Sequence, residues 1–176
     1  MALQTDTAGR LPLDLVASEP DWDTVYAEQL PRIYNFFCYR LRDETTAEDL
    51  TAQTFEKAWR ARHRYRRDLA GFSTWLVAIA RNVATDHLRA RRNHAPLDAA
   101  AEIADASTPE DEHARASDRE RLAALVERLP ERERELLALK YGAGMTNRAI
   151  AELTGLGESN VGTIVHRAVQ TLRRDW

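Results

Sequence analysis

The chain has 176 residues, of which 44% are hydrophobic, 30% charged and 7% aromatic, and its formal net charge is −3. Glycine (7 residues) and proline (6 residues) are scarce beside alanine, leucine, arginine and glutamate, a balance that favours an all-α fold. The single cysteine, Cys38, excludes an internal disulfide, and the lack of a membrane-length apolar run or a signal peptide excludes membrane insertion, so we expect a cytoplasmic protein.

The N-terminal part is predicted to hold a tail followed by a helical region. Residues 1–20 lack helical periodicity, so we expect a mobile tail. Apolar residues then recur at helical spacing from Asp21 to about Arg42. Pro31 interrupts this run, which leaves open either one kinked helix or two helices.

Two further helices are predicted before residue 95. The first runs from Thr46, as N-cap, to about Arg62, with apolar positions at Leu50, Phe55, Ala58 and Trp59. The second runs from Ser73, as N-cap, to Arg92, and its inward positions are Trp75, Leu76, Ile79, Ala80, Val83 and Leu88.

Charge is segregated along the middle of the chain. Residues 57–94 carry ten lysines or arginines against two acids, whereas residues 95–120 carry eight acids against two arginines. The basic block at residues 57–94 predicts DNA binding. Residues 95–116 are acidic, hold two prolines and almost no large apolar residues, so we expect a flexible linker.

After the linker, helices are predicted from Ser117 to about Arg128 and from Pro130 to about Lys140, with leucines such as Leu122 and Leu125 facing inward. Pro130 suits the first turn, and Glu131 suits the positive end of that helix dipole. The chain is therefore predicted to hold two helical domains, residues 21–94 and 117–176, joined by the linker.

Residues 145–174 have the layout of a DNA-reading helix-turn-helix. Thr146 suits the N-cap of its first helix, Gly155 the left-handed C-terminal position, and Gly157 or Glu158 the start of a second helix. The face of that second helix away from its apolar stripe is small and polar and ends in arginine, as a groove-facing surface needs: Glu158, Ser159, Asn160, Gly162, Thr163, His166 and Arg167. A hairpin in an ordinary helical bundle would show the same periodicity.

The segment from Gly71 to Arg92 combines aromatic residues, arginines and an amide. Phe72 and Trp75 lie between arginine clusters, and Asn82 follows on the predicted helix. These side chains could stack on bases, contact phosphates and read a base edge of a separated DNA strand. The alternatives are that the aromatic residues belong to the core and that the arginines form a solvated face.

Two stretches of the first half resemble region two of bacterial sigma factors. They are Ala47–Trp59 and Phe72–Asn82, the second followed by Asp86 and Arg89. The sequence from Leu129 through the helix-turn-helix resembles region four. With only a short linker between them, the chain is similar to the extracytoplasmic-function group of the sigma-70 family. The resemblance implies a factor that binds core RNA polymerase, directs it to promoter DNA and promotes strand opening.

The same resemblance implies roles for individual positions. The surface that docks on the polymerase would be formed by Asp49, Leu50, Gln53, Thr54, Phe55 and Trp59. The melted minus-ten element would be held by Arg64, Arg66, Arg67, Phe72, Arg81, Asn82, Asp86, Arg89 and Arg92, with Arg91 beside them. Capture of an unstacked base costs a few kcal/mol, which stacking and hydrogen bonding offset.

Duplex DNA at the minus-thirty-five element would be read by Glu158, Ser159, Asn160, Thr163, His166 and Arg167. Gly162 is expected to leave one base contact without a side chain, and Gly157 stands where the family often has a capping residue. The family precedent for a regulator is an anti-sigma factor that occludes the same DNA and polymerase surfaces.

Other classes of function fit the sequence less well. The five histidines show no metal-ligand spacing, and no phosphate-binding glycine loop is present, so we expect no metal, no cofactor and no catalysis. A stand-alone DNA-binding repressor or activator explains the last domain but leaves the Asp49–Trp59 surface unused. A protein-binding adaptor would add no salt-dependent promoter affinity.

Overall fold

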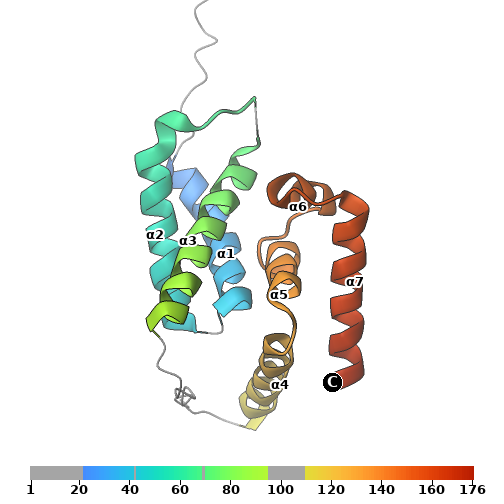
Figure 1. Ribbon diagram of the computed structural model, residues 1–176. Helices are drawn as coiled ribbons and strands as arrows, with labels where there is room; N and C mark the ends of the chain where they lie inside the picture. The colour runs from blue at the N-terminus through green and yellow to red at the C-terminus, as the bar shows by residue number, and fades with distance from the viewer. Residues whose placement is uncertain (1–21, 42, 69, 95–109) are drawn as a thin grey trace, which may run out of the picture.

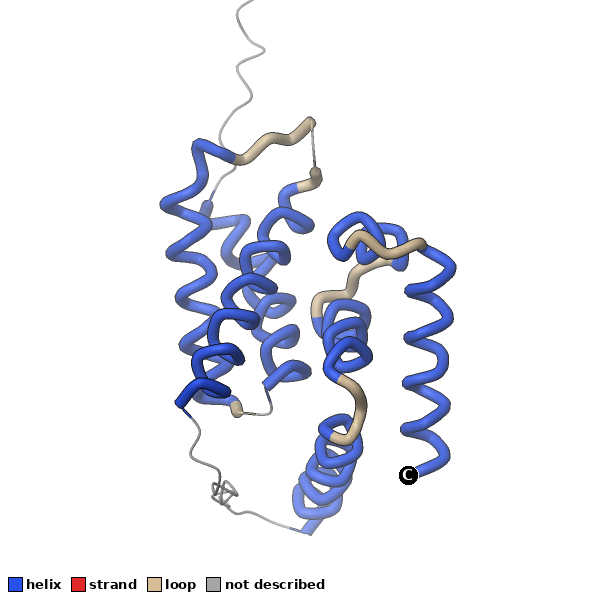
Figure 2. Tube along the Cα trace, in the orientation of Figure 1, coloured by secondary structure: helices blue, strands red, loops and turns tan. Residues whose placement is uncertain are grey.

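The computed structural model describes residues 22–41, 43–68, 70–94 and 110–176, and within these ranges all regular structure is helical (Figure 2). The predicted all-α fold is confirmed. The predicted tail, and residues 95–109 of the predicted linker, lie outside the described residues.

The first half forms a bundle of three helices, α1 (Trp22–Leu41), α2 (Glu44–Ala61) and α3 (Phe72–His94), with a 3-10 turn η1 (Arg62–Arg64) after α2. Pro31 lies inside α1, so the first of the two alternatives, one helix, is the one observed. Its missing N–H is tolerated on the exposed side, while Ile33, Phe36 and Phe37 are fully buried.

The N-caps predicted for the next two helices are wrong. Asp43, in extended conformation, is the N-cap of α2, and Thr46 lies in the first turn with its hydroxyl donating to the Asp43 carboxylate. That hydrogen bond is the main reason why the pKa of Asp43 is lowered. Ser73 is likewise a residue of the first turn, because α3 begins at Phe72.

The second half contains α4 (Glu110–Glu127), α5 (Glu131–Leu137) and a π-helical turn, η2 (Ala138–Gly142). α4 begins seven residues before the predicted start at Ser117, inside the segment assigned to the linker, and Pro130 is the N-cap of α5 instead of a first-turn residue. Leu125 is buried as predicted, but Leu122 is 42% exposed.

The helix-turn-helix is formed by α6 (Asn147–Thr154) and α7 (Glu158–Asp175). Thr146 caps α6 as predicted, because its hydroxyl accepts the N–H of Ala149 at 3.1 Å. Gly155 has φ of 74°, the left-handed conformation expected of a residue that ends a helix. Gly157 is the N-cap of α7 and offers no side chain to its N–H groups.

The two halves of the chain pack against each other and share one hydrophobic core. α1 contacts η2 and α5, and α3 contacts α6, so the three-helix bundle and the α4–α7 unit lie side by side (Figure 1). Phe36 of α1, Leu139 of η2 and Val161 of α7 belong to the same cluster of buried residues. The sequence predicted two helical domains on a linker and did not predict this contact.

Candidate nucleic-acid interface

The predicted polymerase-docking residues divide into exposed and buried side chains. Asp49, Gln53 and Trp59 are exposed on α2, and Trp59 is 48% accessible with the Arg62 guanidinium 4.2 Å above its ring. The other three side chains are buried, so they hold α2 in the bundle and do not reach a partner directly; they are Leu50, Thr54 and Phe55.

Thr54 shows how a polar residue fits inside this bundle. Its hydroxyl donates to the carbonyl of Leu50 at 2.7 Å, and the hydroxyl of Thr51 donates to the carbonyl of Ala47 at 2.6 Å. Both buried hydroxyls are therefore satisfied within α2 itself, which leaves the outer face of the helix unconstrained by them.

One face of α3 presents an amide, a carboxylate and a cation to solvent. Asn82, Asp86 and Arg89 are all exposed, and their spacing of four and three residues places them on one side of the helix. This is the arrangement that the strand-binding prediction requires: an amide able to hydrogen-bond a base edge, with a cation one to two turns away for phosphate.

Phe72 lies at the start of α3 within a group of aromatic rings. Its ring centroid is 5.7 Å from that of Trp22, 5.2 Å from that of Tyr65 and 5.3 Å from that of Trp75. Phe72 and Trp75 are half-buried by these contacts, and Leu76 is fully buried. The core interpretation therefore accounts for much of the aromatic surface that the sequence offered for base stacking.

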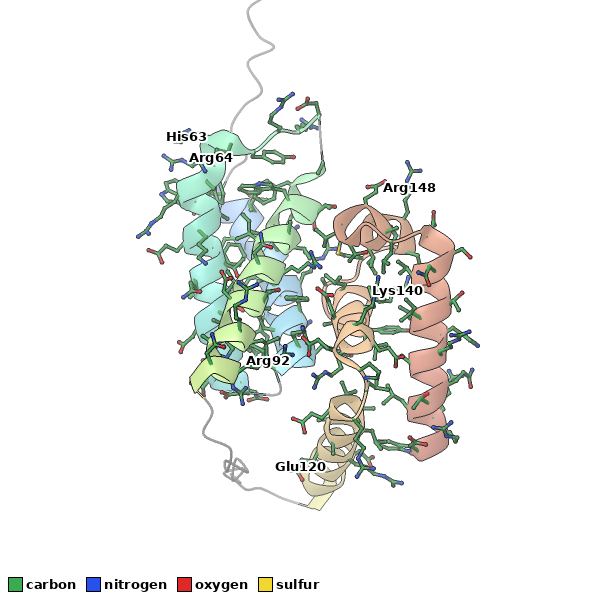
Figure 3. The ribbon with its side chains drawn as sticks, viewed as in Figure 1. His63, Arg64, Arg92, Glu120, Lys140 and Arg148 are labelled. Carbon is green, nitrogen blue, oxygen red and sulfur yellow. The ribbon has the colours of Figure 1, made fainter. Side chains whose placement is uncertain are left out.

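Three of the predicted arginines lie in the connection between α2 and α3. Arg64, Arg66 and Arg67 are all exposed, and Figure 3 shows Arg64 beside His63 at the end of α2 that leads into this connection. Arg66 is paired with Asp68 at 2.7 Å, an exposed contact that solvent and salt weaken.

Arg81 and Arg92 differ from the other predicted DNA contacts because each meets a glutamate of α5. The Nε of Arg81 donates to Glu135 at 2.6 Å, and Arg92 lies 3.6 Å from Glu131. The side chain of Arg81 is 31% exposed and that of Glu135 19% exposed. Arg81, assigned to the minus-ten element, is thus held by a carboxylate from the second half of the chain, whereas the contact of Arg92 is longer and its side chain is 70% exposed.

The carboxylate of Glu131 pairs with more than one cation. It pairs with the buried guanidinium of Arg40 and receives a hydrogen bond of 2.6 Å from Arg134. Burial opposes ionisation of this carboxyl, but Arg40 and Arg134 outweigh it and hold the pKa of Glu131 below its usual value. The sequence analysis assigned Glu131 only to the helix dipole.

The predicted duplex-reading residues share one exposed face of α7. This face begins at the first residue of the helix and covers its first three turns; its members are Glu158, Ser159, Asn160, Thr163, His166 and Arg167. The inward side of the same helix is formed by Val161, Val165 and Ala168, which are buried against α5 and α6. The structure therefore brings the six polar residues together.

Gly162 was expected on that outer face, and this prediction is wrong. It is half-buried, and a Cβ added at this position would meet the side-chain Nδ2 of Asn147 at 3.2 Å. Gly162 therefore lies against the start of α6. Its small size allows the close approach of the two helices, and the expectation that it leaves one base contact without a side chain stays a prediction.

The residues that join the two halves were missed by the sequence analysis. Arg32 donates two hydrogen bonds, from Nε and Nη2, to the carbonyl of Ala143 at 3.0 and 2.8 Å. A Cβ at Gly142 would lie 2.8 Å from the Cα of Phe36 and 2.9 Å from the carbonyl oxygen of Asn35. None of these contacts has a local periodic pattern that could have revealed it.

Over the described part of the chain, no group of histidine, cysteine, aspartate or glutamate side chains has the arrangement of a metal site. The helices described are all too short or too polar to cross a membrane. Cys38 is half-buried beside Tyr34, and burial raises the pKa of its thiol, which keeps it protonated and poorly nucleophilic.

The chain is similar in sequence to bacterial sigma factors. Residues 25–94 match the family described as Sigma-70 region 2, and residues 119–172 match Sigma-70, region 4. The chain is 31% identical to the ECF RNA polymerase sigma factor BldN of Streptomyces coelicolor, over 90% of this chain and 61% of BldN. It is 31% identical to the ECF RNA polymerase sigma factor ShbA of Streptomyces griseus subsp. griseus, over 72% of this chain and 69% of ShbA.

The share of each relative's length that the chain spans differs from one relative to another. The chain spans less than two thirds of BldN and 35% of the probable RNA polymerase sigma factor RfaY of Xanthomonas campestris. The fold is similar to that of the sigma factor RpoE of Bartonella quintana in its complex with the anti-sigma factor NepR, with a TM-score of 0.67 and 20% identity over 88% of this chain and 96% of that one.

Proposed function

Because the chain belongs to the extracytoplasmic-function group of the sigma-70 family of RNA polymerase sigma factors, we propose that it binds core RNA polymerase and directs it to specific promoters. On this proposal residues 21–94 bind the polymerase and the minus-ten element, and residues 117–176 bind the minus-thirty-five element. Residues 95–116 connect these two domains. It acts in the cytoplasm, without cofactor, metal or catalysis of its own.

The observation that carries this proposal is the presence of two different polar faces in one chain. The α3 face, with Asn82, Asp86 and Arg89, suits a separated strand, because an amide can pair with an exposed base edge. The α7 face, with Asn160 and Arg167, suits the major groove of a duplex. A stand-alone repressor would need only the duplex-binding face of α7.

Strand opening follows from the α3 face by differential binding. If the amide of Asn82 and nearby cations bind a base only after it has left the stack, they stabilise the open state and not the duplex. Arg64, Arg67 and Arg89 are exposed and can neutralise phosphates on either side of that base. No hydrolysis is required.

The polymerase contact is proposed for the exposed side of α2. Asp49, Gln53 and Trp59 supply a carboxylate, an amide and a large aromatic surface, a mixture found at protein interfaces. Because the buried hydroxyls of α2 are bonded within the helix, we expect the helix to bind without rearrangement.

A further partner is proposed from the structural neighbours. RpoE of Bartonella quintana is in complex with an anti-sigma factor, NepR, and CnrH is in complex with the cytosolic domain of CnrY. We propose that an anti-sigma factor of this general kind binds the present chain and covers its DNA-binding and polymerase-binding faces.

The decisive experiment is run-off transcription with purified core RNA polymerase on a library of genomic fragments. The proposal predicts discrete start sites that appear only when the chain is added. A repressor or adaptor would bind DNA or protein in the same mixture and produce no new transcript.

Pull-down by core polymerase tests the α2 surface separately. The double variant Asp49→Ala with Gln53→Ala should be retained less than the native chain, since both side chains are exposed on one side of α2. The matched control is Glu48→Ala, an exposed acid on the same helix turned by about 100° from Asp49. Equal retention of the double variant and the control would remove this surface from the proposal.

A further inference from the structure

Residues 62–68, called here the arginine segment, follow α2 and lead toward α3 (Figure 1), and they include four arginines. Arg62 lies 4.2 Å from the centre of an aromatic ring of α2, and Arg66 is paired with an acid inside the segment. Among the described residues Arg64 and Arg67 form no ion pair, and both side chains are exposed. These two arginines are therefore the cations of the segment that remain available for phosphate.

Tyr65 lies in the middle of the arginine segment and packs against the start of α3. Its ring centroid is 5.2 Å from that of Phe72 and 5.3 Å from that of Trp75. These separations are within the range in which aromatic rings attract each other. Tyr65 is half-buried, whereas its two neighbours in the chain, Arg64 and Arg66, are exposed. One side chain thus ties the segment to α3.

The backbone at Tyr65 explains why the ring and the arginines lie on different sides. η1 ends there, and Tyr65 has φ of −64° and ψ of 128°, an extended conformation. Successive side chains of an extended segment point to opposite sides, so an inward ring at Tyr65 directs Arg66 outward. The nearby backbone hydrogen bonds are long: the N–H of Tyr65 donates to the carbonyl of Arg62 at 3.2 Å, and that of Ala70 to the carbonyl of Arg66 at 3.3 Å. The ring contacts therefore contribute much of the order of the segment.

A second side chain, Trp22 at the start of α1, supports both ends of the arginine segment. Its ring centroid is 5.2 Å from that of Trp59 in α2 and 5.7 Å from that of Phe72 in α3. Both pairs are edge-to-face, with interplanar angles of 81° and 80°. Because Phe72 also contacts Tyr65, ring contacts connect α1 through α3 to the segment. The segment is therefore attached to the bundle on both sides of Arg64.

We propose that Tyr65 is a positioning residue, whose packed ring holds Arg64 and Arg67 where phosphates of the separated minus-ten strand lie. This inference deepens the proposed function and rests on it for the identity of the ligand. Cations so close together in the chain repel one another, so a segment without its anchor would spread them over many positions. Fixing the arginines before binding lowers the entropy cost of each contact. In this role Tyr65 acts through the arginines and does not contact the DNA.

Limited digestion of the full chain with trypsin tests the anchoring without DNA or polymerase. Trypsin cleaves after arginine, and a segment must be mobile to enter its active site. Tyr65→Ala removes the ring contacts with α3, so we expect faster cleavage within residues 62–68, measured by mass spectrometry. Tyr65→Phe keeps the ring and should be cleaved as slowly as the native chain.

Tyr39→Ala is the matched control for trypsin, because it removes a tyrosine side chain that is 47% exposed on α1. Circular dichroism checks that each variant keeps its helical content. If Tyr65→Ala loses helix, Tyr65→Leu, which keeps apolar volume without a ring, takes its place. Cleavage of the folded Tyr65 variant at the native rate would overturn the anchoring.

The salt dependence of DNA binding distinguishes positioning from direct contact. The assay uses the chain bound to core polymerase and a fluorescein-labelled promoter from the run-off screen with an unpaired bubble over the minus-ten element. We expect Tyr65→Ala to weaken binding and to reduce the slope of log K against log salt by about 0.7 for each of the one or two displaced arginines. Tyr39→Ala should leave both unchanged. Weaker binding with an unaltered slope would mean that the ring contacts a base, and would overturn the positioning role.

A double-mutant cycle supplies a second measurement of the same role. In a chain that already carries Arg64→Ala and Arg67→Ala, adding Tyr65→Ala should weaken bubble binding much less than it does in the native chain, because the side chains that it positions are gone. Equal losses in the two backgrounds would overturn the proposal. Absence of any run-off transcript would defeat the proposed function and with it the DNA role of Tyr65, whereas the anchoring by its ring is decided by trypsin alone.

Discussion

The guanidinium of Arg40 in α1 pairs with the carboxylate of Glu131 at the start of α5, although the two residues are 91 positions apart in the chain. Only 6% of the Arg40 side chain is accessible. A buried cation without its partner is strongly destabilising, so this pair ties the position of α5 to that of the three-helix bundle.

Loss of the carboxylate should therefore cost stability. We expect Glu131→Ala to lower the free energy of unfolding by about 3 kcal/mol, because it leaves the Arg40 charge buried and uncompensated. Urea unfolding followed by circular dichroism would measure the change. Glu56→Ala, which removes an exposed pair with Arg60, is the control and should cost less than about 1 kcal/mol. A similar loss in both variants would contradict the buried character of the Arg40 pair.

The contact between the two halves of the chain should weaken in acid. The pKa of Glu131 is lowered in the folded chain from its usual value of 4.5, so its contribution is complete above about pH 4.5 and is lost as the pH falls through the lower folded value. The radius of gyration measured by scattering between pH 7 and pH 3.5 should rise in that acid range. Glu131→Gln has no carboxyl to titrate at this position, so its radius of gyration should change less with pH. If its radius of gyration rises in acid as steeply as that of the native chain, Glu131 is not the cause of the acid expansion.

Asn82→Ala should impair promoter opening more than initial duplex binding. The amide is exposed on α3 and is proposed to bind a base only after that base has left the stack. Permanganate reactivity of unpaired thymines would report opening, and a gel-shift titration with polymerase would report binding. Asn93→Ala, the same change three turns later on α3, serves as the control. Equal loss of opening and binding in the Asn82 variant would count against the proposed role.

Arg167→Ala should weaken binding of the polymerase-bound chain to the upstream element and reduce the slope of log K against log salt by about 1, as expected for one lost phosphate contact. Arg167 is exposed on the polar face of α7. Arg121→Ala removes an arginine that lies 4.9 Å from the Trp176 ring centroid and has no assigned DNA role, so it should leave the slope unchanged. An unaltered slope for Arg167→Ala would remove this residue from the contact surface.

Local patterns in the sequence predicted the helices but not all their ends. Thr146 and Gly155 were identified correctly because capping and left-handed backbone depend on neighbouring residues alone. Thr46 was mistaken for a cap because Asp43, three residues earlier, offers the same chemistry. The start of α4 was missed because helical periodicity is weak where few large apolar residues occur.

The relation between the two halves could not be predicted in the same way. Gly142 carries no sign in the sequence that the backbone of α1 will lie against it, since a glycine after a helix usually suggests a turn. Glu135 looked like an ordinary charged helix residue until the fold placed Arg81 opposite it. Contacts between distant segments arise from three-dimensional packing, and the residues that make them show no distinctive local pattern in a single sequence.

Residues 95–109 join the bundle to α4 in one continuous chain, and this has a consequence for how the contact between the two halves responds to protein abundance. Association between parts of one polypeptide is a first-order equilibrium, so dilution does not shift it. A cell with few copies and a cell with many would hold the same proportion of molecules in which the two halves are apart. Only a competing ligand, a change in ionic conditions or a covalent modification can alter that proportion.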